Sequence, residues 1–176
     1  SNRFSQRGIY QHYKMISNSS PVPVILYNVP SRTGSNLDAE TTLSLAHDFK
    51  NIIGIKEASG NFEKAMKIIQ HRPKDFLVIS GDDAITLPLL ACGADGVISV
   101  IANAFPKDFS EMVRVGLEGN FEKARKLHYK LTEITHAIFV DGNPSGIKGL
   151  LTILNVCSEH VRLPLMSVGK STMNKF

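Results

Sequence analysis

The sequence predicts an α/β fold in which parallel strands alternate with helices. Four short runs are apolar and rich in β-branched residues, and Gly, Pro, Asn or Asp bounds them, a pattern typical of strands buried on both faces. Longer amphipathic stretches separate these runs. Because a helix follows each strand, we expect parallel strands joined by right-handed crossovers, as in a β/α barrel or a doubly wound sheet.

The alternation begins with a helix at residues 7–17. The expected strands are residues 22–29, 52–58, 76–80 and 96–100, and the expected helices between them are residues 38–49, 62–71 and 83–92.

The segment GNFEKA occurs twice, at residues 60–65 and 119–124. In both copies an Asn precedes a helical pattern and a Glu follows in the first turn, which is a helix-start signal. We therefore interpret Asn61 and Asn120 as N-caps, and not as traces of a duplicated domain.

The pattern changes after residue 104. Residues 107–118, 121–139 and 144–155 are helical without strands between them, so we predict β/α units over residues 1–104 and a helical domain over residues 105–176. A closed (β/α)8 barrel needs eight strands and four are visible. The chain is therefore expected to hold strands 5–8 of a TIM barrel, a half barrel with C-terminal helices, which about another hundred residues before Ser1 would complete.

Composition excludes several classes of protein. The chain is 43% hydrophobic and 20% charged, as expected for one globular domain or a large piece of a bigger one. Its net charge of +4 is spread over helical faces of mixed sign, so we expect no nucleic-acid partner. No apolar run is long enough for a membrane span or a signal peptide. A soluble cytoplasmic protein is the default expectation.

Cysteine and histidine give no sign of a disulfide or a metal. Cys92 and Cys157 both have apolar neighbours, and we interpret them as buried or half-buried free thiols. The six histidines have no metal-binding spacing, so we predict no zinc-dependent chemistry and no metal.

Lys56 closes the apolar strand 52–58 and allows two interpretations. The strand ends at Ile55 and Lys56 points to solvent, pairing with Glu57; or strand alternation turns Lys56 inward with Ile52 and Gly54. In a barrel the inward lysine lies at the carboxyl ends of the strands, where active sites lie. Burial lowers the pKa of such a lysine, which supplies the neutral amine that attacks a carbonyl.

Tyr27 and Arg32 lie near the end of the preceding strand. Tyr27 either packs its ring and exposes its hydroxyl, or relays protons beside Lys56. Arg32, in a loop between Pro30 and Gly34, is either simply solvated or offers two donors to a carboxylate. Together with Lys56 these residues predict a pocket for condensing keto acids.

Two glycine-containing segments call for simpler interpretations. In SGDD, residues 80–83, Asp82 and Asp83 are expected to start a helix and not to bind a metal, while Gly81 lets a ligand approach the backbone closely. Gly169-Lys170-Ser171 is not a phosphate-binding loop, because Pro164 stands where the first glycine would be.

Four ordered blocks carry a family resemblance. They are YNVPSRTG at residues 27–34, IGIKEASG at 53–60, SGDD at 80–83 and GADGVISV at 93–100. Together they resemble the dihydrodipicolinate synthase and N-acetylneuraminate lyase family of class I aldolases and lyases, over about residues 8–164. The resemblance implies a TIM barrel with a helical C-terminal domain, usually a homotetramer, acting in diaminopimelate and lysine biosynthesis.

The resemblance also implies site residues. Lys56 would form a Schiff base with pyruvate, with no other cofactor, and Tyr27 would relay protons. Arg32 would bind the carboxylate of L-aspartate 4-semialdehyde, and Gly81 and Ile98 would line the pyruvate site. Arginine in PSRTG is typical of the synthase branch; the sister branches, N-acetylneuraminate lyase and keto-deoxy sugar acid aldolases, are the alternatives.

Three departures from the family bear on activity. Ser1 stands where the family has a relay tyrosine before an asparagine, here Asn2. The family's carboxylate-binding Thr-Thr pair would precede Ser1, so we expect the chain alone to be inactive or nearly so. NPSGIK at residues 143–148 replaces the commoner NPIPVK. An alternative of another class is a non-catalytic half-barrel module, whose open sheet edges favour self-association.

Overall fold

The computed structural model describes residues 4–176. The chain divides into two compact units, the first ending at Ile98 and the second running from Ser99 to Phe176. The predicted boundary, after residue 104, lies close to this division.

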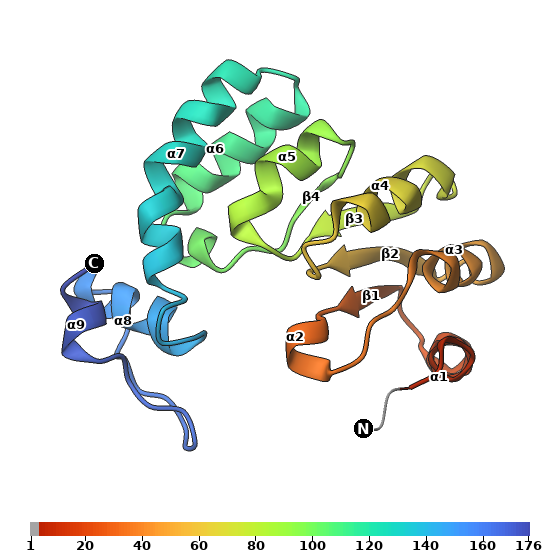
Figure 1. The fold of residues 1–176 in the computed structure, drawn as a ribbon, viewed down its shortest axis with the longest axis horizontal. Coiled ribbons are helices and arrows are strands. Elements are labelled where there is room, and N and C mark those ends of the chain that lie inside the picture. Colours follow the sequence, from red (N-terminus) through yellow and green to blue (C-terminus); the bar gives the residue numbers. More distant parts are fainter. Residues whose placement is uncertain (1–3) are drawn as a thin grey trace. The chain divides into compact units, whose positions relative to one another are not determined.

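The first unit contains a four-stranded sheet in the order β1-β2-β3-β4, and all three strand pairs are parallel (Figure 1). The prediction of an α/β fold with parallel strands is confirmed. The strands are β1 (Val24–Asn28), β2 (Ile52–Glu57), β3 (Leu77–Ser80) and β4 (Gly96–Val97), and the helices are α1 (Gln6–Ser19), α2 (Pro30–Thr33), α3 (Ala39–Asp48), α4 (Phe62–His71), η1 (Asp83–Ile85) and α5 (Thr86–Ala91).

β4 is shorter than the predicted strand 96–100. Ile98 still donates its N–H to the carbonyl oxygen of Ser80 (3.1 Å), but the chain then enters a helical turn, since Val100 has φ −87° and ψ −51°. Val100 therefore caps the turn η2 (Ile101–Asn103) and does not extend the strand. Ile101 of this turn is buried, so the apolar run continues past the end of β4.

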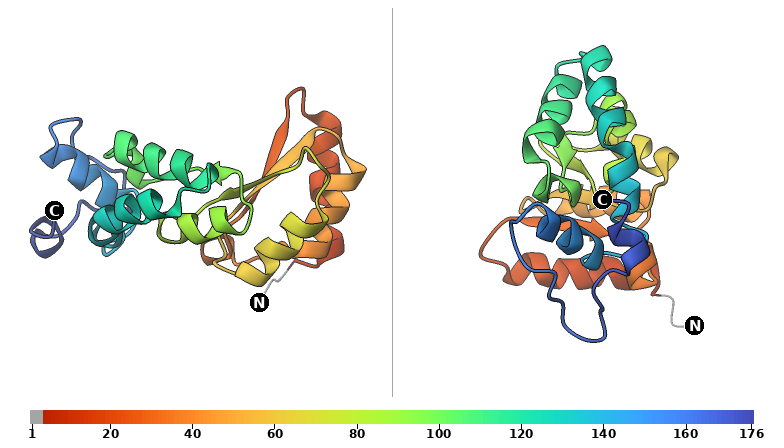
Figure 2. Two further views of the ribbon diagram at one scale, coloured as in Figure 1. Left: turned by 90° about the horizontal axis from the view of Figure 1, so that it is seen from above. Right: turned by 90° about the vertical axis from the view of Figure 1, so that its left-hand side faces the viewer.

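One face of the sheet carries the core of this unit. Leu26, Ile55 and Val78 of the strands pack with Leu45 of α3 and Ile68 of α4, and α1 adds partly buried side chains. The ribbon views agree that α1, α3 and α4 line the same face of the sheet (Figures 1 and 2).

The opposite face has exposed apolar side chains. Ile25 and Tyr27 of β1 are 40% and 43% exposed, and Leu77 of β3 is 38% exposed. Strand alternation explains both faces, because successive side chains point to opposite sides of the sheet.

The pairing of β1 with β2 corrects one detail of the predicted alternation. Val24 pairs with Ile52 but Ile25 pairs with Gly54, so the register shifts by one residue at Ile53. Such a bulge switches the face of the residue before it. Ile52 therefore packs in the core together with Ile55, and not on the face of Lys56 as predicted.

The second unit is helical in the residues described, as predicted. Besides η2 it contains α6 (Pro106–Leu117), α7 (Phe121–Ala137), α8 (Ser145–Ile153) and a short α9 (Lys170–Met173) that sequence did not predict. α6 and α7 pack side by side (Figure 1), and each buries the apolar residues of one stripe, including Met112, Val115 and Leu131.

The predicted N-caps are confirmed in both units. The side chain of Asn61 accepts a hydrogen bond from the N–H of Lys64 (3.0 Å) at the start of α4. The side chain of Asn120 does the same for Lys123 (3.2 Å) at the start of α7. The repeated segment therefore marks two helix starts.

The prediction for one cysteine is wrong. Cys92 is half-buried but Cys157 is exposed. Cys157 follows the end of α8 in a segment whose apolar residues, such as Val156 and Leu163, are themselves exposed.

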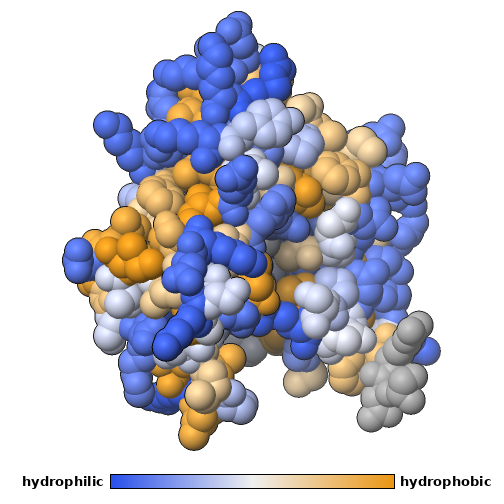
Figure 3. All heavy atoms as spheres, turned by 60° about the vertical axis from the view of Figure 1, so that its left-hand side comes forward, coloured by the Kyte–Doolittle hydropathy of each residue, from blue (hydrophilic) through white to orange (hydrophobic). Residues whose placement is uncertain are grey.

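Apolar surface is interspersed with hydrophilic surface in the space-filling view (Figure 3). Within residues 4–176, no helix is long and apolar enough to cross a membrane.

Gly146 should be intolerant of any side chain. A Cβ at this position would lie 1.6 Å from the carbonyl oxygen of Ile138, at the end of α7. Because that neighbour is backbone and cannot rotate away, we expect Gly146→Ala to lower the free energy of unfolding by about 1–3 kcal/mol, measured by urea denaturation.

Gly96→Ala is the matched control, since a Cβ at Gly96 would meet no heavy atom within 4 Å. It should change the free energy of unfolding by less than about 1 kcal/mol. Equal effects of the two substitutions would show that the close contact at Gly146 does not limit this position.

Candidate active site

Tyr27 and Lys56 lie side by side at the carboxyl ends of β1 and β2. Their Cα atoms are register partners, so both side chains leave the same face of the sheet. The Nζ atom of Lys56 lies 4.1 Å from the centre of the Tyr27 ring, a cation–π distance. The predicted juxtaposition of these two residues is therefore present.

Gly81 brings the end of β3 close to Lys56. Its N–H donates to the carbonyl oxygen of Glu57 (2.9 Å). A Cβ at Gly81 would lie 2.6 Å from the Cβ of Ala58 and 3.2 Å from the Cε of Lys56. Only glycine fits here, because a side chain would displace either the strand or the lysine.

Ile98 lies at the same end of the sheet. Its backbone is held by the hydrogen bond to Ser80, and its side chain is 48% exposed. Gly81 and Ile98 thus follow the ends of adjacent strands, β3 and β4, in the row that Tyr27 and Lys56 begin.

Arg32 lies on a short helix and not in the predicted loop. Pro30 starts α2 and Gly34 ends it with φ +66°, which is the usual terminating conformation. The Arg32 side chain is exposed and makes no ion pair with another residue in the range 4–176. The Arg32 side chain makes no ion pair or cation–π contact with Lys56 or Tyr27 in the described part of the chain.

A buried polar cluster lies beneath Tyr27 and Lys56, on the helix-covered face. Asn28 and Glu57, the residues after Tyr27 and Lys56, are each 3% exposed. The Asn28 Nδ2 donates to the Glu57 Oε1 (3.0 Å), and Lys64 of α4 places its Nζ 3.0 Å from the Glu57 Oε2. Glu57 therefore pairs with Lys64, and not with Lys56 as one interpretation held.

Backbone groups and Asn36 complete this cluster. The N–H of Leu37 donates to the Asn28 Oδ1 (2.9 Å), and the N–H of Ser59 donates to the Glu57 Oε1 (2.9 Å). The Asn36 Oδ1 accepts from the Asn28 Nδ2 (3.0 Å) and from the Lys64 Nζ (3.3 Å). The buried charges are thus paired and hydrogen-bonded, the condition for their burial. We refer to Asn28, Asn36, Glu57 and Lys64 as the strand-end clamp.

The strand-end clamp was not predicted from the sequence. The available signal was that a polar residue follows both Tyr27 and Lys56 at the end of an apolar strand. Alternation turns that residue toward the core, where a carboxylate needs a partner.

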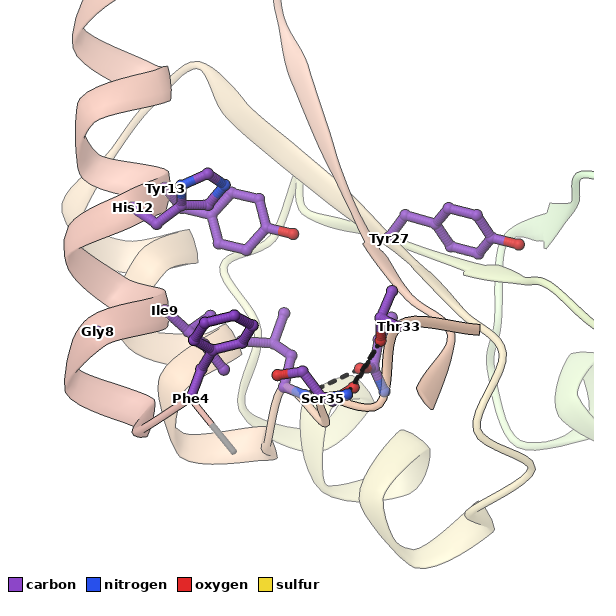
Figure 4. A pocket seen from close by; sticks show the side chains of 10 residues that line it. Phe4, Gly8, Ile9, His12, Tyr13, Tyr27, Thr33 and Ser35 are labelled. Atoms are coloured by element: carbon purple, nitrogen blue, oxygen red, sulfur yellow. Dashed lines mark hydrogen bonds between the residues drawn. The ribbon is translucent and has the colours of Figure 1, made fainter. Parts of the chain in front are cut away.

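A separate cavity of about 420 Å³ lies between α1 and β1. It is lined by Phe4, Gly8, Ile9, His12, Tyr13, Tyr27, Asn28, Thr33, Ser35 and Leu37. Figure 4 shows the Tyr13 ring directed into this space, whereas the Tyr27 ring extends away from α1. Burial raises the pKa of Tyr13. Tyr27 borders this cavity, but Lys56 is not among its lining residues.

The acidic residues after β3 start a helix. The Asp82 side chain accepts from the N–H of Ala84 (3.0 Å) and caps η1, as predicted. The described part of the chain contains no group of three or more His, Cys, Asp or Glu side chains that could hold a metal ion. Ser1 and Asn2, where the relay-tyrosine loop was expected, lie outside the described residues.

Comparison with known proteins gives a consistent match. The sequence model of the dihydrodipicolinate synthetase family matches residues 1–176. Proteins named 4-hydroxy-tetrahydrodipicolinate synthase from Flavobacterium psychrophilum and Phocaeicola vulgatus are 56% and 55% identical over 174 residues, 99% of this chain and 59% of each relative. The chain thus spans 59% of the length of these curated relatives.

Solved structures agree in fold. The crystal structure of dihydrodipicolinate synthase from Aquifex aeolicus has a TM-score of 0.96 at 38% identity, with 99% of this chain and 60% of that chain covered. The corresponding structure from Thermotoga maritima has a TM-score of 0.96 at 39% identity and the same coverage.

The two lysines of α4 should differ sharply in their contribution to stability. Lys64→Met leaves the Glu57 carboxylate buried without its cation, so we expect it to lower the free energy of unfolding by about 3–5 kcal/mol. Lys67, also on α4, makes an exposed ion pair with Glu40 of α3, and Lys67→Met should change stability by less than about 1 kcal/mol.

Urea denaturation at neutral pH and moderate salt measures both variants. If Lys64→Met were as well tolerated as Lys67→Met, the Glu57–Lys64 pair would contribute little, and Asn28 and the backbone donors alone would hold Glu57.

Proposed function

The chain belongs to the dihydrodipicolinate synthetase family, and we propose that it supplies the Schiff-base lysine of a pyruvate-dependent, class I aldolase-type lyase. The reaction condenses pyruvate with L-aspartate 4-semialdehyde, in the cytoplasm, as a step of diaminopimelate and lysine biosynthesis. The observation that carries the proposal is Lys56, with its Nζ 4.1 Å from the centre of the Tyr27 ring at adjacent strand ends. The names of the curated relatives support the reaction.

The first half of the reaction activates pyruvate. The neutral amine of Lys56 attacks the C2 carbonyl and gives a carbinolamine, which loses water to form an imine. Tyr27 is proposed to pass protons to and from the carbinolamine oxygen, since a phenol beside the amine acts as both donor and acceptor. Loss of a proton from C3 then converts the imine to an enamine.

The second half joins the two substrates. C3 of the enamine attacks the aldehyde carbon of the semialdehyde, forming the new carbon–carbon bond and regenerating the imine, while the aldehyde oxygen takes up a proton and becomes a hydroxyl group. The amino group of the semialdehyde then attacks the imine carbon and closes the ring. This step breaks the bond to Lys56 and returns the free amine. The covalent imine on Lys56 is thus an intermediate, and the scheme uses no separate cofactor.

Substrate binding is proposed for three further residues. The Gly81 backbone lies against the Lys56 Cε and would line the pyruvate site, and Ile98 supplies an exposed apolar surface at the same end of the sheet. Arg32 has an exposed guanidinium with no ion pair in the described residues, and it would bind the carboxylate of the semialdehyde. No metal takes part in this scheme.

We further propose that the sheet forms half of a (β/α)8 barrel, strands 5–8, with Tyr27 and Lys56 on the inner side, in a homo-oligomer, a tetramer by family resemblance. The consecutive strand order and the single helix-covered face support this arrangement. The chain alone should be inactive or nearly so, because the carboxylate-binding groups of the family are expected elsewhere.

Sister lyases are the alternative within the family. N-acetylneuraminate lyase and keto-deoxy sugar acid aldolases use the same lysine chemistry with other acceptors. Assays with L-aspartate 4-semialdehyde and with sugar aldehydes separate them, and Arg32 favours the first.

Trapping with borohydride tests the Schiff base. Pyruvate followed by borohydride should leave a stable adduct on Lys56 in the protein at the full length that its gene encodes, located by mass spectrometry of peptides. Tyr27→Phe should slow adduct formation by about 10²-fold, the contribution of one general acid–base group.

The matched control is Lys50→Ala, which removes an exposed lysine before the same strand and should leave the adduct unchanged. Lys56→Ala should abolish it. A wild-type protein that gives no adduct at Lys56 would sink the proposed mechanism, and rapid turnover by the 176-residue chain alone would sink the claim that it is inactive.

A non-catalytic assembly module is the second candidate. The exposed apolar face at Ile25, Tyr27 and Leu77 favours it. So do the outer edges of β1 and β4, which pair with no further strand within the described residues. Such edges bind other strands. We expect the 176-residue chain to self-associate, measured by sizing with light scattering. A monodisperse monomer at micromolar concentration would contradict this expectation.

A further inference from the structure

The strand-end clamp touches the same two strands as the candidate active site, but from the other face. Each of its strand residues directly follows a reactive residue: Asn28 follows Tyr27, and Glu57 follows Lys56. We propose that Glu57, held by Lys64, is a positioning residue that fixes where Lys56 lies relative to Tyr27 along the direction of the strands. This proposal rests on the proposed function.

The last backbone hydrogen bonds of the sheet explain why a clamp is needed. The N–H of Ala58 donates to the carbonyl oxygen of Asn28 (2.8 Å), and beyond that point β1 turns into α2. A slip of one residue would send Lys56 to the helix-covered face, because side chains alternate. Register has already shifted once in this strand pair, at Ile53.

The Asn28–Glu57 hydrogen bond supplies that restraint. It joins side chains directly opposite each other in the register, as Tyr27 and Lys56 are. Any displacement of β1 along β2 that separates Tyr27 from Lys56 also stretches this buried bond. An unsatisfied group at 3% exposure is costly.

Glu57 also extends the restraint to β3 and α4. Its carbonyl oxygen accepts from the N–H of Gly81, the residue that lies against the Lys56 Cε. Its carboxylate binds Lys64 in the first turn of α4. Through Glu57, β2 is therefore connected to β1, β3 and α4.

Lys64 has a second effect, on charge. Glu57 points to the covered face, where Lys64 neutralises its charge, so this carboxylate does not pair with Lys56. Among the residues that the structure describes, Lys56 makes no ion pair and rests against an aromatic ring. A weak contact of that kind leaves the amine free to react.

The test uses a double variant that removes the clamp without leaving a buried charge. Glu57→Leu with Lys64→Met replaces the ion pair by apolar groups of similar size, an exchange that is often neutral for stability. We expect the double variant to be as stable in urea as the wild type, or nearly so. Its limiting rate of adduct formation with saturating pyruvate should nevertheless fall by about tenfold or more, since misplacement by about 1 Å can slow a reaction 10²-fold.

Asp95→Asn is the matched control. Asp95 is also a strand-end carboxylate: it accepts from the N–H of Val78 (2.8 Å) and pairs with Arg72, at the amino end of β3 and away from Lys56. Its trapping rate should stay within about twofold of the wild type, when every variant is compared under conditions where circular dichroism shows it folded.

A second measurement does not depend on pyruvate. Competitive acetylation by trace acetic anhydride reports the exposure and reactivity of each lysine. Labelling of Lys56 relative to Lys50 should rise by about two- to fivefold in the double variant, the factor corresponding to one lost cation–π contact, and should stay unchanged in Asp95→Asn.

The outcomes separate the two hypotheses. A stable double variant with wild-type trapping and labelling would overturn the positioning role and leave the pair purely structural. A wild type without adduct would overturn the proposed function, and the labelling comparison would then decide the positioning claim alone. If the double variant does not fold, Glu57→Gln, measured by the same two readouts, decides it.

Discussion

The register between β1 and β2 is the constraint on which the site depends. It makes Tyr27 the partner of Lys56 and, one residue later, Asn28 the partner of Glu57. Since strand side chains alternate, the first pair lies on the open face and the second on the covered face. A single register therefore builds a reactive pair and the buried polar pair beneath it, and neither can be shifted without the other.

Close approach of β2 and β3 adds the second constraint. A Cβ at Gly54 would lie 2.9 Å from the carbonyl oxygen of Leu77, and one at Gly81 would lie 2.6 Å from the Cβ of Ala58. These two glycines let the strands approach at both ends of their pairing. At Gly81 the missing side chain also lets the backbone lie against the Lys56 side chain, so strand packing and the position of Lys56 depend on the same glycine.

Local patterns in the sequence predicted most of this arrangement. β-branched apolar runs marked the strands, and Asn61 and Asn120 marked helix starts, because each of these signals acts within a few residues. The matching positions of Tyr27 and Lys56 at the ends of consecutive strands predicted their contact, because consecutive parallel strands pair side by side. The bulge at Ile53 and the Glu57–Lys64 pair were not predictable in this way. Both arise from packing between elements, since α4 must return over β2 before Lys64 can reach Glu57. The exposure of Cys157 likewise depends on how the chain runs after α8, and not on its apolar neighbours.

The two lysines near the end of β2 show how the same side chain serves opposite purposes. Lys64 is 8% exposed and is held by a buried carboxylate, and removing one partner of such a pair costs about 3–5 kcal/mol. Lys56 is half-buried and rests on the ring of Tyr27, a contact that contributes only about 0.5–1 kcal/mol at this exposure. A nucleophile must leave its resting contact to attack a carbonyl, and a structural cation must not. The difference in these energies agrees with the proposed roles, reaction for Lys56 and support for Lys64, and the strand that carries Glu57 keeps the two lysines on opposite faces.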